Sequence, residues 1–476
     1  MIPNGPQLIA ESEHEILDQG APDLVEAVKV AVDDEDSSSL EVLKNRPFLA
    51  LWLAQASTQI GGNMVLYGLT VQVYSLTNST SAVSLLILSF LVPAVLLSAV
   101  AGVYVDRLDR RLILIVTNLL RAILFGLLFF IGNSLIVILV LNVVVSTVTT
   151  FFAPAEAAMI PVLVPRRQLL AANGIFTVTL NAAFAIGFAL LGPLVVNLTS
   201  PQALLLVVAA FYLAAMVLVI TLPAAPPKSD DHPHGLSVHD AGAAAASTFG
   251  QLREGIAFIR DNRSVTWSLV YLGITASLIG VVGVVGPAFA TEALGLAAKD
   301  FVVIVLPLGI GVVTGILLLN SYGKYVPRRR LIETGLILLG IFLAILSAAG
   351  PVSRFLQHVT SAAPVDVSSL VSLLAVVIVL AFLAGIAYAS VAIPSQTQLQ
   401  EDLPQEVRGR VFGVLNMLIS TASFLPIIIF GVIADWVSTT AVVFVVGLAI
   451  TVSGVLSVAL RRSQPSEPSQ PSQHAQ

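Results

Sequence analysis

The sequence predicts an all-α polytopic membrane protein with twelve transmembrane helices in two pseudo-symmetric six-helix halves. The 476 residues are 57% hydrophobic and only 11% charged, with a mean hydropathy of +0.94, whereas soluble chains carry about 25% charged residues. The apolar residues fall into runs of about 20, the length of a helix that crosses a bilayer. The alternating hydrophobicity of a membrane barrel is absent, so the spans are expected to be helices.

Composition also excludes several classes of function. The chain has no cysteine, which rules out disulfides, thiolate metal sites and cysteine catalysis. It has no P-loop, no H-E-x-x-H motif and no basic region preceding an apolar signal core. We therefore expect neither an enzyme nor a cofactor, and no cleaved signal peptide. The net charge of −5, with the bases scattered in short loops, gives no support for nucleic-acid binding.

In chain order, residues 1–44 predict an acidic, disordered cytoplasmic tail. Residues 45–222 form the N-terminal half, 223–264 a cytoplasmic linker, 265–462 the C-terminal half and 463–476 a second disordered tail. Apolar spacing near 249–260 predicts an amphipathic helix in the linker, and the linker histidines are expected to be solvated rather than metal-bound. The twelve predicted spans are 48–74, 82–105, 112–131, 134–154, 173–198, 203–222, 265–290, 302–320, 331–349, 369–393, 411–433 and 441–460.

The loops between these spans predict the orientation. Of 23 lysines and arginines, 20 fall on one side of the predicted membrane. Lys299 and Arg354 fall on the other side, and Arg121 lies within a span. By the positive-inside rule, both termini are cytoplasmic, and the protein is expected in the plasma (cell inner) membrane.

The two halves look like copies of one another. P-R-R-R-L-I at 327–332 follows the eighth span, as D-R-R-L-I at 109–113 follows the second. Pro154-Ala-Glu156 near the end of span four corresponds to Pro394-Ser-Gln396 near the end of span ten. Duplicated halves imply a binding site between them near the midplane, which opens to each side in turn.

Several motifs resemble one transporter family. The decamer G-V-Y-V-D-R-L-D-R-R at 102–111 is similar to the loop signature of the major facilitator superfamily, with Asp109 in place of a glycine. This replacement resembles the bacterial exporter branch that includes enterobactin and macrolide efflux proteins. Further stretches resemble that branch in order along the chain: N-R-P-F-L-A-L-W-L-A-Q at 45–55, L-T-N-S-T-S-A at 76–82, F-F-A-P-A-E-A-A-M-I-P-V-L-V-P at 151–165, L-R-E-G-I-A-F-I-R at 252–260 and R-G-R-V-F-G at 408–413. The resemblance implies the twelve-helix fold of the superfamily and an exporter coupled to protons.

A row of uncharged polar side chains suggests the substrate path. Gln55, Gln59, Asn63 and Tyr67 are spaced four residues apart and share one face of the first span. Because an amide facing lipid is costly, this ridge either lines a cavity or bonds neighbouring helices, and we favour the cavity. In the superfamily, spans one, four, seven and ten line the path, which adds four further candidates: Asn142, Ser146, Tyr271 and Tyr388.

Charged residues suggest gating or coupling. Asp106 is expected to cap or pair with the start of span eleven near Arg408 and Arg410, and so to stabilise the state that is closed to the cytoplasm. Glu156 is expected to pair with Arg110 or Arg111, with proton exchange as the alternative. Arg121 lies ~15 Å along its helix from the decamer, so it must face the protein interior, through packing or substrate contact. The candidate gating or coupling residues are Gly102, Asp106, Arg107, Arg110, Arg111, Arg121, Glu156, Arg408 and Arg410.

The residues and the resemblance together predict a secondary active exporter of a hydrophobic or amphipathic small molecule, of the drug or siderophore type. Its expected partners are that molecule and the lipid bilayer, and it is expected to be a monomer. A lipid or lysolipid flippase is the alternative within transport. A transporter-like membrane sensor or scaffold, which would use the acidic tail, is the alternative of another class.

Overall fold

The computed structural model describes residues 41–226, 260, 262–348, 367–402 and 425–462, and every regular element in these ranges is helical. Ten helices are long and apolar enough to cross a membrane, and they stand at ten of the twelve predicted positions. The first position holds α2 (Arg46–Thr77), whose 32 residues can cross but include polar residues such as Gln55, Gln59 and Asn63. The eleventh holds helix Leu425–Trp436, and the residues before it lie outside the described ranges.

Other predicted features fall outside the described ranges too. These are the linker helix, the histidines of the linker, Arg408 and Arg410, and most of the two tails. The predicted boundary of the first tail is late by a few residues, because Glu41–Lys44 form a short 3₁₀ helix, η1, ahead of α2.

The N-terminal bundle contains the helices up to residue 220. After α2 the elements are α3 (Thr80–Arg107), α4 (Arg110–Ile131), α5 (Leu135–Leu163), α6 (Leu169–Phe184), η3 (Ala185–Leu191), α7 (Gly192–Leu198) and α8 (Pro201–Ile220). α2 and α4 pack on α8, and α5 packs on α3 and α4. The fifth predicted span therefore consists of α6, the π-helical stretch η3 and α7.

The C-terminal bundle contains the helices from residue 263 onward. The elements are α10 (Arg263–Glu292), the 3₁₀ turn η4 (Ala298–Phe301), α11 (Val302–Tyr322), α12 (Arg328–Ser347), α14 (Val367–Asp402), helix Leu425–Trp436 and α16 (Thr439–Arg462). α11 and α12 pack on α14, and α16 packs on α12.

Short capping residues start the helices where the sequence turns back into the membrane. Asn45, Ser79, Asp109 and Ser200 each accept a hydrogen bond from a backbone N–H in the first turn of the helix that follows. These caps satisfy donors that no helix can satisfy internally at its start. Large apolar side chains such as Phe130 and Ile136 point outward and are 73% exposed, as expected of a surface that faces lipid tails.

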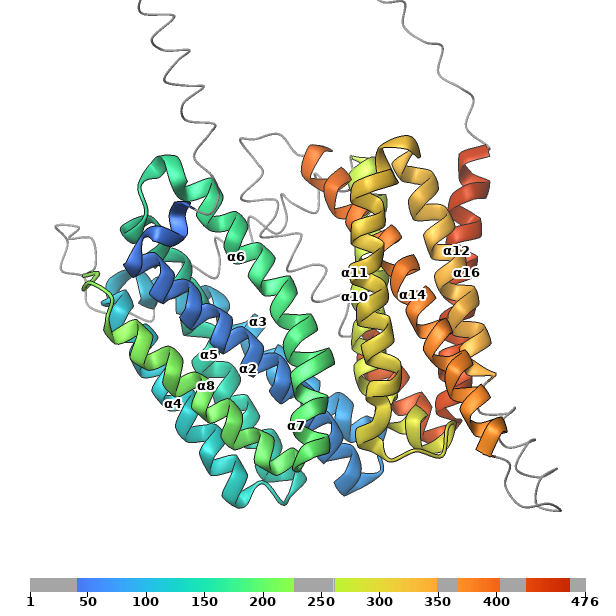
Figure 1. Ribbon diagram of the computed structural model, residues 1–476, viewed down its shortest axis with the longest axis horizontal. Helices are drawn as coiled ribbons and strands as arrows, with labels where there is room; N and C mark the ends of the chain where they lie inside the picture. The colour runs from blue at the N-terminus through green and yellow to red at the C-terminus, as the bar shows by residue number, and fades with distance from the viewer. Residues whose placement is uncertain (1–40, 227–259, 261, 349–366, 403–424, 463–476) are drawn as a thin grey trace, which may run out of the picture.

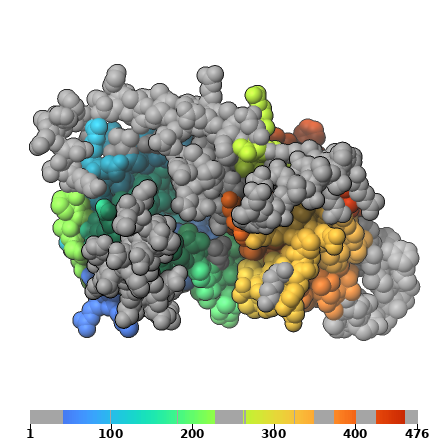
Figure 2. Space-filling view, turned by 90° about the horizontal axis from the view of Figure 1, so that it is seen from above, coloured from blue at the N-terminus to red at the C-terminus, as the bar shows by residue number. Residues whose placement is uncertain are grey.

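The two bundles lie side by side (Figure 1). We call one end of the molecule the arginine end, because the helix ends that carry Arg107, Arg110 and Arg111 in one bundle and Arg328, Arg329 and Arg330 in the other both lie there. The opposite end contains Asn78, Ser200 and Lys299. The ribbons of the bundles come nearest each other at the opposite end, at the bottom of Figure 1. Figure 2 views the molecule from the arginine end, with the yellow and orange helices of the C-terminal bundle at the right.

Candidate transport path and its closure

The polar ridge of α2 divides into a buried part and a partly exposed part. Gln55 is only 2% exposed, and its Oε1 has no hydrogen-bond partner. Gln59 and Asn63 are partly exposed, and the Asn63 amide donates to the backbone carbonyl of Gln59 at 2.8 Å. Since the helix itself satisfies that donor, Asn63 keeps its Oδ1 for other partners. Gln59 and Asn63 are therefore the ridge residues best placed to meet a ligand.

The π-helical stretch η3 packs directly on this ridge. Pro193 has no backbone N–H, and the N–H of Gly192 reaches back five residues to the carbonyl of Gly187. A Cβ on Gly187 would come within 2.8 Å of the Asn63 Cβ, and one on Gly192 within 3.0 Å of the Tyr67 Cβ. The two glycines of the sequence G-F-A-L-L-G-P thus allow η3 to approach α2 closely.

Aromatic rings join the two bundles at the far end of the ridge. The ring of Tyr67 stacks on Phe301 of η4 with centroids 4.6 Å apart, and Phe188 of η3 packs edge-on against Tyr67 at 5.8 Å. The Tyr67 hydroxyl also donates to the backbone carbonyl of Lys299. Tyr67 and Phe301 are fully buried. We call Tyr67, Phe188 and Phe301 the aromatic junction; it closes the space between the bundles at the opposite end.

A polar clamp closes the same end from the side of α3. Asp435, at the end of helix Leu425–Trp436, accepts hydrogen bonds from the backbone N–H groups of Thr80 (2.7 Å) and Ser81 (3.0 Å). The hydroxyls of Ser79 and Thr80 lie 2.7 and 2.6 Å from its carboxylate. One turn deeper, Ser84 donates to the carbonyl of Ile427 at 2.9 Å. A carboxylate is stabilised at a helix N-terminus, so the clamp satisfies charge and orphan donors together.

The clamp keeps its carboxylate ionised. Partial burial by itself would raise the pKa of Asp435. The hydrogen bonds from Ser81, Thr80 and Ser79 favour the charged form, outweigh that effect and lower the pKa to about 2. The clamp therefore stays charged at any physiological pH.

Four further path candidates lie inside the bundles. The Asn142 amide donates to the Leu86 carbonyl and to Ser89, and Ser146 donates to the Phe90 carbonyl, so both bond α5 to α3. Tyr271 is buried and shares a 2.7 Å hydrogen bond with Ser457 of α16. Tyr388 is partly exposed and interacts with Thr275 of α10. Of these four, Tyr388 is the one with surface left for a ligand.

The charged decamer is mostly helical. Gly102, Asp106 and Arg107 belong to the end of α3, and only Leu108 and Asp109 separate it from α4. Asp109, the departure from the family signature, caps α4 by accepting from the N–H of Arg111 at 2.8 Å. The Arg111 guanidinium donates to the Ile220 carbonyl at the end of α8, and the Arg110 N–H donates to the Ala225 carbonyl. These contacts hold the start of α4 against the end of α8 and the residues that follow it, all within the N-terminal bundle.

Arg121 lies in an aromatic cage. It is 2% exposed, with its guanidinium carbon 4.2 Å from the centre of the Phe152 ring and 4.5 Å from that of Tyr212. Its Nε donates to the Thr117 carbonyl and its NH2 group to Asn118 Oδ1 at 2.8 Å. The burial agrees with the cost of leaving an arginine in lipid. Arg121 therefore contacts side chains and backbone of the N-terminal bundle and does not line the space between the bundles.

Glu156 lies within electrostatic reach of Arg121. The carboxylate is 7% exposed and its Oε1 has no hydrogen-bond partner. Among the described residues it forms no ion pair within 4.0 Å, either with Arg110 and Arg111 or with Arg121. Arg121 packs on the ring of Phe152, one helical turn before Glu156 on α5. The arginine nearest this part of α5 is therefore Arg121, and the expected pairing with Arg110 or Arg111 is not formed.

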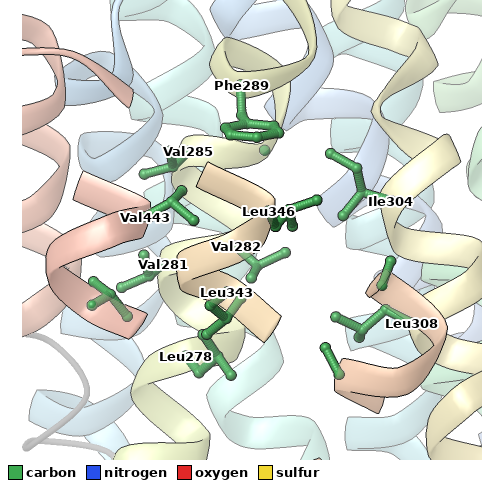
Figure 3. Close-up of a pocket in the computed structure, with 14 residues that line it drawn as sticks. Leu278, Val281, Val282, Val285, Phe289, Ile304, Leu308, Leu343, Leu346 and Val443 are labelled. Atoms are coloured by element: carbon green, nitrogen blue, oxygen red, sulfur yellow. The ribbon is translucent and has the colours of Figure 1, made fainter. Parts of the chain in front are cut away.

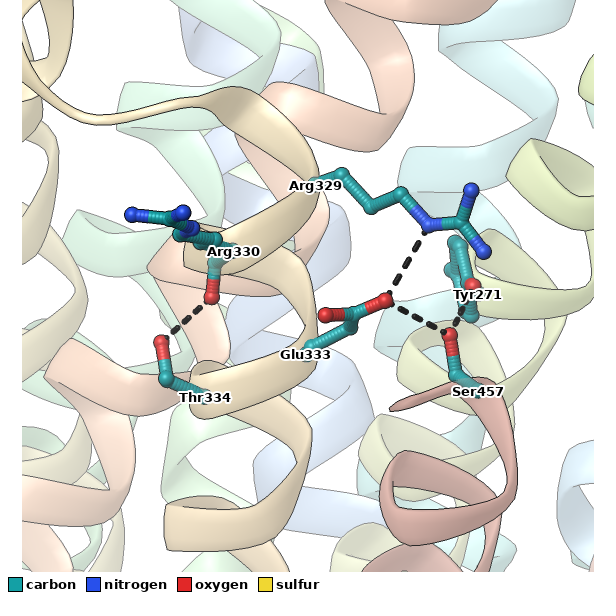
Figure 4. A network of polar contacts seen from close by, with 6 residues as sticks. All are labelled: Tyr271, Arg329, Arg330, Glu333, Thr334 and Ser457. Atoms are coloured by element: carbon teal, nitrogen blue, oxygen red, sulfur yellow. Dashed lines mark hydrogen bonds and ion pairs between the residues drawn. The ribbon is translucent and has the colours of Figure 1, made fainter. Parts of the chain in front are cut away.

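Two acids that take part in these contacts, Glu333 and Asp435, were not among the residues predicted from the sequence. Glu333, 2% exposed in α12, lies 3.1 Å from Arg329 Nε and 3.4 Å from the Ser457 hydroxyl, which in turn bonds Tyr271 (Figure 4). An acid inside a predicted span, 331–349, was the available signal for Glu333. For Asp435, two sequence features were available. Asp435 is an acid on the side of the predicted membrane that has few arginines, and the residues N-S-T-S at 78–81 on the same side are typical of a helix start that can bind an acid.

Two hollows in the C-terminal bundle lie away from the polar ridge of α2, because no residue of α2 lines either of them. One, lined only by apolar side chains such as Leu278, Phe289 and Leu343, has a volume of about 50 Å³ (Figure 3), far below the roughly 300 Å³ of a small ligand pocket. Another, of about 550 Å³, lies between α10, helix Leu425–Trp436 and α16, and its lining is almost entirely apolar, with Thr266 and Ser277 as its polar side chains. The polar ridge of α2, with its partly exposed amides Gln59 and Asn63, is the better candidate for a polar ligand contact.

Comparison with known proteins adds a family. A model of the Major Facilitator Superfamily matches residues 51–425. Macrolide efflux protein A of Streptococcus pyogenes is 24% identical over 395 residues, which cover 82% of this chain and 89% of that protein. Multidrug efflux pump Tap of Mycolicibacterium fortuitum is 22% identical over 433 residues, covering 88% and 97%. An uncharacterized transporter of Bacillus subtilis, YfiS, is 23% identical over 421 residues, covering 86% and 92%.

Solved structures share the fold. The nucleoside transporter NupG superposes with a TM-score of 0.61 at 13% identity, covering 88% of this chain and 99% of that one. A bacterial homologue of the human lysosomal transporter Spinster gives 0.61 at 14% identity, covering 89% and 95%. At these identities the likeness concerns the fold alone.

Proposed function

Since the chain belongs to the major facilitator superfamily, we propose that it is a proton-coupled exporter of a hydrophobic or amphipathic small molecule, of the drug or siderophore type. It works by alternating access between two six-helix halves. The ten apolar helices supply ten of the spans. In this proposal α2 and a span that ends in helix Leu425–Trp436 are the other two. The path runs between the bundles, along Gln59 and Asn63.

The observation that carries this proposal is the way the bundles meet. Among the described residues, the side-chain hydrogen bonds between the bundles lie at the opposite end, with the polar clamp and the aromatic junction. The Tyr74 and Thr291 hydroxyls add a contact at 3.1 Å. Most of these bonds involve hydroxyls, backbone groups or a single carboxylate at helix ends, so they separate without unfolding a helix. A molecule held closed at one end by separable contacts is what alternating access requires.

We assign the arginine end to the cytoplasm and the opposite end to the outside of the plasma membrane, following the positive-inside rule. The clamp and junction then form the outer gate. Reporter fusions after Asn78 and after Pro233 test this orientation. Opposite signals are expected, with the Pro233 fusion cytoplasmic; equal signals overturn the orientation.

The substrate class follows from the chemistry of the path. Gln59, Asn63 and Tyr388 are partly exposed and uncharged, so they offer a few hydrogen bonds beside apolar surface. Such a lining suits a large, mostly apolar molecule better than a sugar or an inorganic ion. The similarity to efflux proteins for macrolides and multiple drugs supports the same class and the outward direction.

Transport into inside-out vesicles, with a panel of macrolides, amphipathic cationic dyes and siderophores, tests the function. Uptake of at least one compound, driven by a proton gradient and abolished by an uncoupler, is expected. Gln59→Ala and Asn63→Ala should each change the preference among compounds, while Asn142→Ala, a matched amide that bonds α3, should lower all transport equally. Uptake of none of these compounds, with transfer of labelled lipid instead, contradicts export and favours a flippase.

A further inference from the structure

Two carboxylates are buried inside the membrane-spanning helices of the described chain, and their surroundings differ. Glu333 in the C-terminal bundle has the guanidinium of Arg329 at 3.1 Å and the hydroxyl of Ser457 nearby (Figure 4). Glu156 in the N-terminal bundle is 7% exposed, has an oxygen with no hydrogen-bond partner, and lies beyond ion-pair distance of Arg121. Glu333 is a neutralised structural charge, whereas Glu156 is not neutralised by any described contact.

An ionised carboxylate without a partner is unfavourable in a protein interior, and more so within a membrane. The guanidinium of Arg121 lies over the ring of Phe152, which stands one helical turn before Glu156 on the same face of α5. The other charged residues on helices packed against α5 sit near the arginine end: Arg110 and Arg111 on α4, Asp106 and Arg107 on α3, and Arg46 on α2. Arg110 lies ~16 Å along α4 from Arg121, and α6 carries no charge.

The guanidinium of Arg121 is occupied elsewhere. It lies between the rings of Phe152 and Tyr212 and bonds Thr117 and Asn118. A guanidinium over two rings is stable without a carboxylate. Two arrangements of the site are therefore available: a protonated Glu156 with Arg121 in its aromatic cage, or an ionised Glu156 with Arg121 drawn towards it.

The aromatic cage of Arg121 also contacts α2 beside its polar ridge. The Tyr212 hydroxyl lies 3.4 Å from the position a Cβ would take on Gly62, and its ring lies 3.8 Å from that on Gly61. These glycines stand between Gln59 and Asn63 on α2. A shift of Arg121 out of its cage releases Tyr212, and Tyr212 contacts the segment that carries the ligand-facing amides. Tyr212 thus contacts both Arg121 and the segment of α2 between Gln59 and Asn63.

We propose that Glu156 binds the coupling proton and that Arg121 is its charge partner once the proton has left. The inference rests on the proposed proton-coupled transport. In the arrangement described, the proton is on the carboxyl group; its release to the arginine end leaves a carboxylate that pairs with the Arg121 guanidinium. Substrate on the ridge favours one arrangement through Tyr212, and this links the two fluxes.

Infrared difference spectroscopy of the purified protein in lipid nanodiscs tests the proton site without a substrate. The wild type should show the carbonyl band of a buried protonated carboxyl group that disappears as the pH is raised. Glu156→Gln should lose this band, and Glu333→Gln, the matched buried acid, should keep it. In Arg121→Met the band should persist to higher pH, because the carboxylate has lost its partner. A band that survives in Glu156→Gln, or its absence from the wild type, overturns the assignment.

Transport measurements distinguish a failure of this inference from a failure of the proposed function on which it rests. Glu156→Gln should exchange substrate across the membrane without a gradient yet fail to accumulate it against one. If the wild type itself ignores a proton gradient, the proposed coupling is wrong. If the wild type is driven by protons and Glu156→Gln accumulates substrate as well as the wild type, the coupling stands and the proton site is elsewhere. Thermal stability of both variants in detergent shows whether they are folded.

Discussion

The Asp435 carboxylate lies 2.7 Å from the backbone nitrogen of Thr80, across the boundary between the two bundles. It receives hydrogen bonds from the first residues of α3 and has no positive side chain beside it among the described residues. The polar clamp therefore depends on a helix N-terminus, whose donors stay in place when the carboxylate leaves, and not on a salt bridge.

The first prediction concerns this clamp. Asp435→Asn replaces a charged acceptor, whose hydrogen bonds are worth about 1.5–3 kcal/mol, with a neutral amide that fits the donors less well. We expect the gate to open roughly tenfold more often. Because the chain has no native cysteine, labelling of Ile87→Cys, which lies beside Gly283 of α10, by an impermeant maleimide measures the opening.

Glu292→Gln is the matched control for the clamp. Glu292 lies at the same end, but its hydrogen bond from Thr439 stays within the C-terminal bundle. Its labelling rate should equal that of the wild type. Equal rates in Asp435→Asn and Glu292→Gln would remove the clamp from the gate.

The second prediction concerns pH. The hydrogen-bonded Asp435 has its pKa lowered from 3.8 to about 2, so its contribution is present above the ordinary value and is lost only as the pH falls through about 2. In the Glu156→Gln background, which lacks the proposed proton site, the clamp should be unaffected between about pH 5 and 8. A constant distance between spin labels at Ser134→Cys and Ala297→Cys is expected. A distance that lengthens towards pH 5 would show that another group controls the gate.

The third prediction concerns the aromatic junction. Tyr67→Phe keeps the ring stacked on Phe301 and removes the donor to the Lys299 carbonyl, which should cost about 1 kcal/mol. Tyr67→Ala also removes a fully buried ring, which should cost roughly 3–5 kcal/mol. Melting in detergent should rank wild type, Tyr67→Phe and Tyr67→Ala in falling order. An equal loss in both variants would mean that the hydroxyl, and not the ring, holds the junction.

The fourth prediction concerns the contact between α11 and α14. A Cβ on Gly385 would enter the van der Waals shell of the Leu308 carbonyl oxygen and lie 2.9 Å from the Gly311 Cα. Gly385→Ala should force the helices apart and cost roughly 1–3 kcal/mol. Gly126→Ala meets nothing within 4 Å and should be neutral or stabilising by up to about 1 kcal/mol. Melting temperatures in detergent check both, and a stable Gly385→Ala contradicts the close contact.

The sequence predicted most of the fold because lipid leaves few choices. Backbone groups without water must bond within a helix, so apolar length alone located ten of the spans that the structure describes. The first span was predicted by length despite its amides, and it does form a helix of 32 residues. The π-helical break at Ala185–Leu191 was not predicted, because it depends on how Gly187 and Gly192 pack on α2.

The site was harder to predict, because periodicity gives the face of a helix but not its neighbour. Asn142 and Ser146 share a polar face, but that face meets α3. Glu156 was expected to pair with the arginines of the decamer, whereas it stands on α5 one turn after Phe152, whose ring packs on Arg121. Asp435 and Thr80 are 355 residues apart, and no local pattern connects them.

The distance between the bundles at both ends tests alternating access most directly. Spin labels at Ser134→Cys and Ala297→Cys report the opposite end, and labels at the exposed Leu170→Cys and Tyr325→Cys report the arginine end. Introducing Asp435→Asn should lengthen the first distance and shorten the second in the same fraction of molecules. Distances that change at one end only, or in the same sense at both ends, would contradict the transport cycle proposed for this chain.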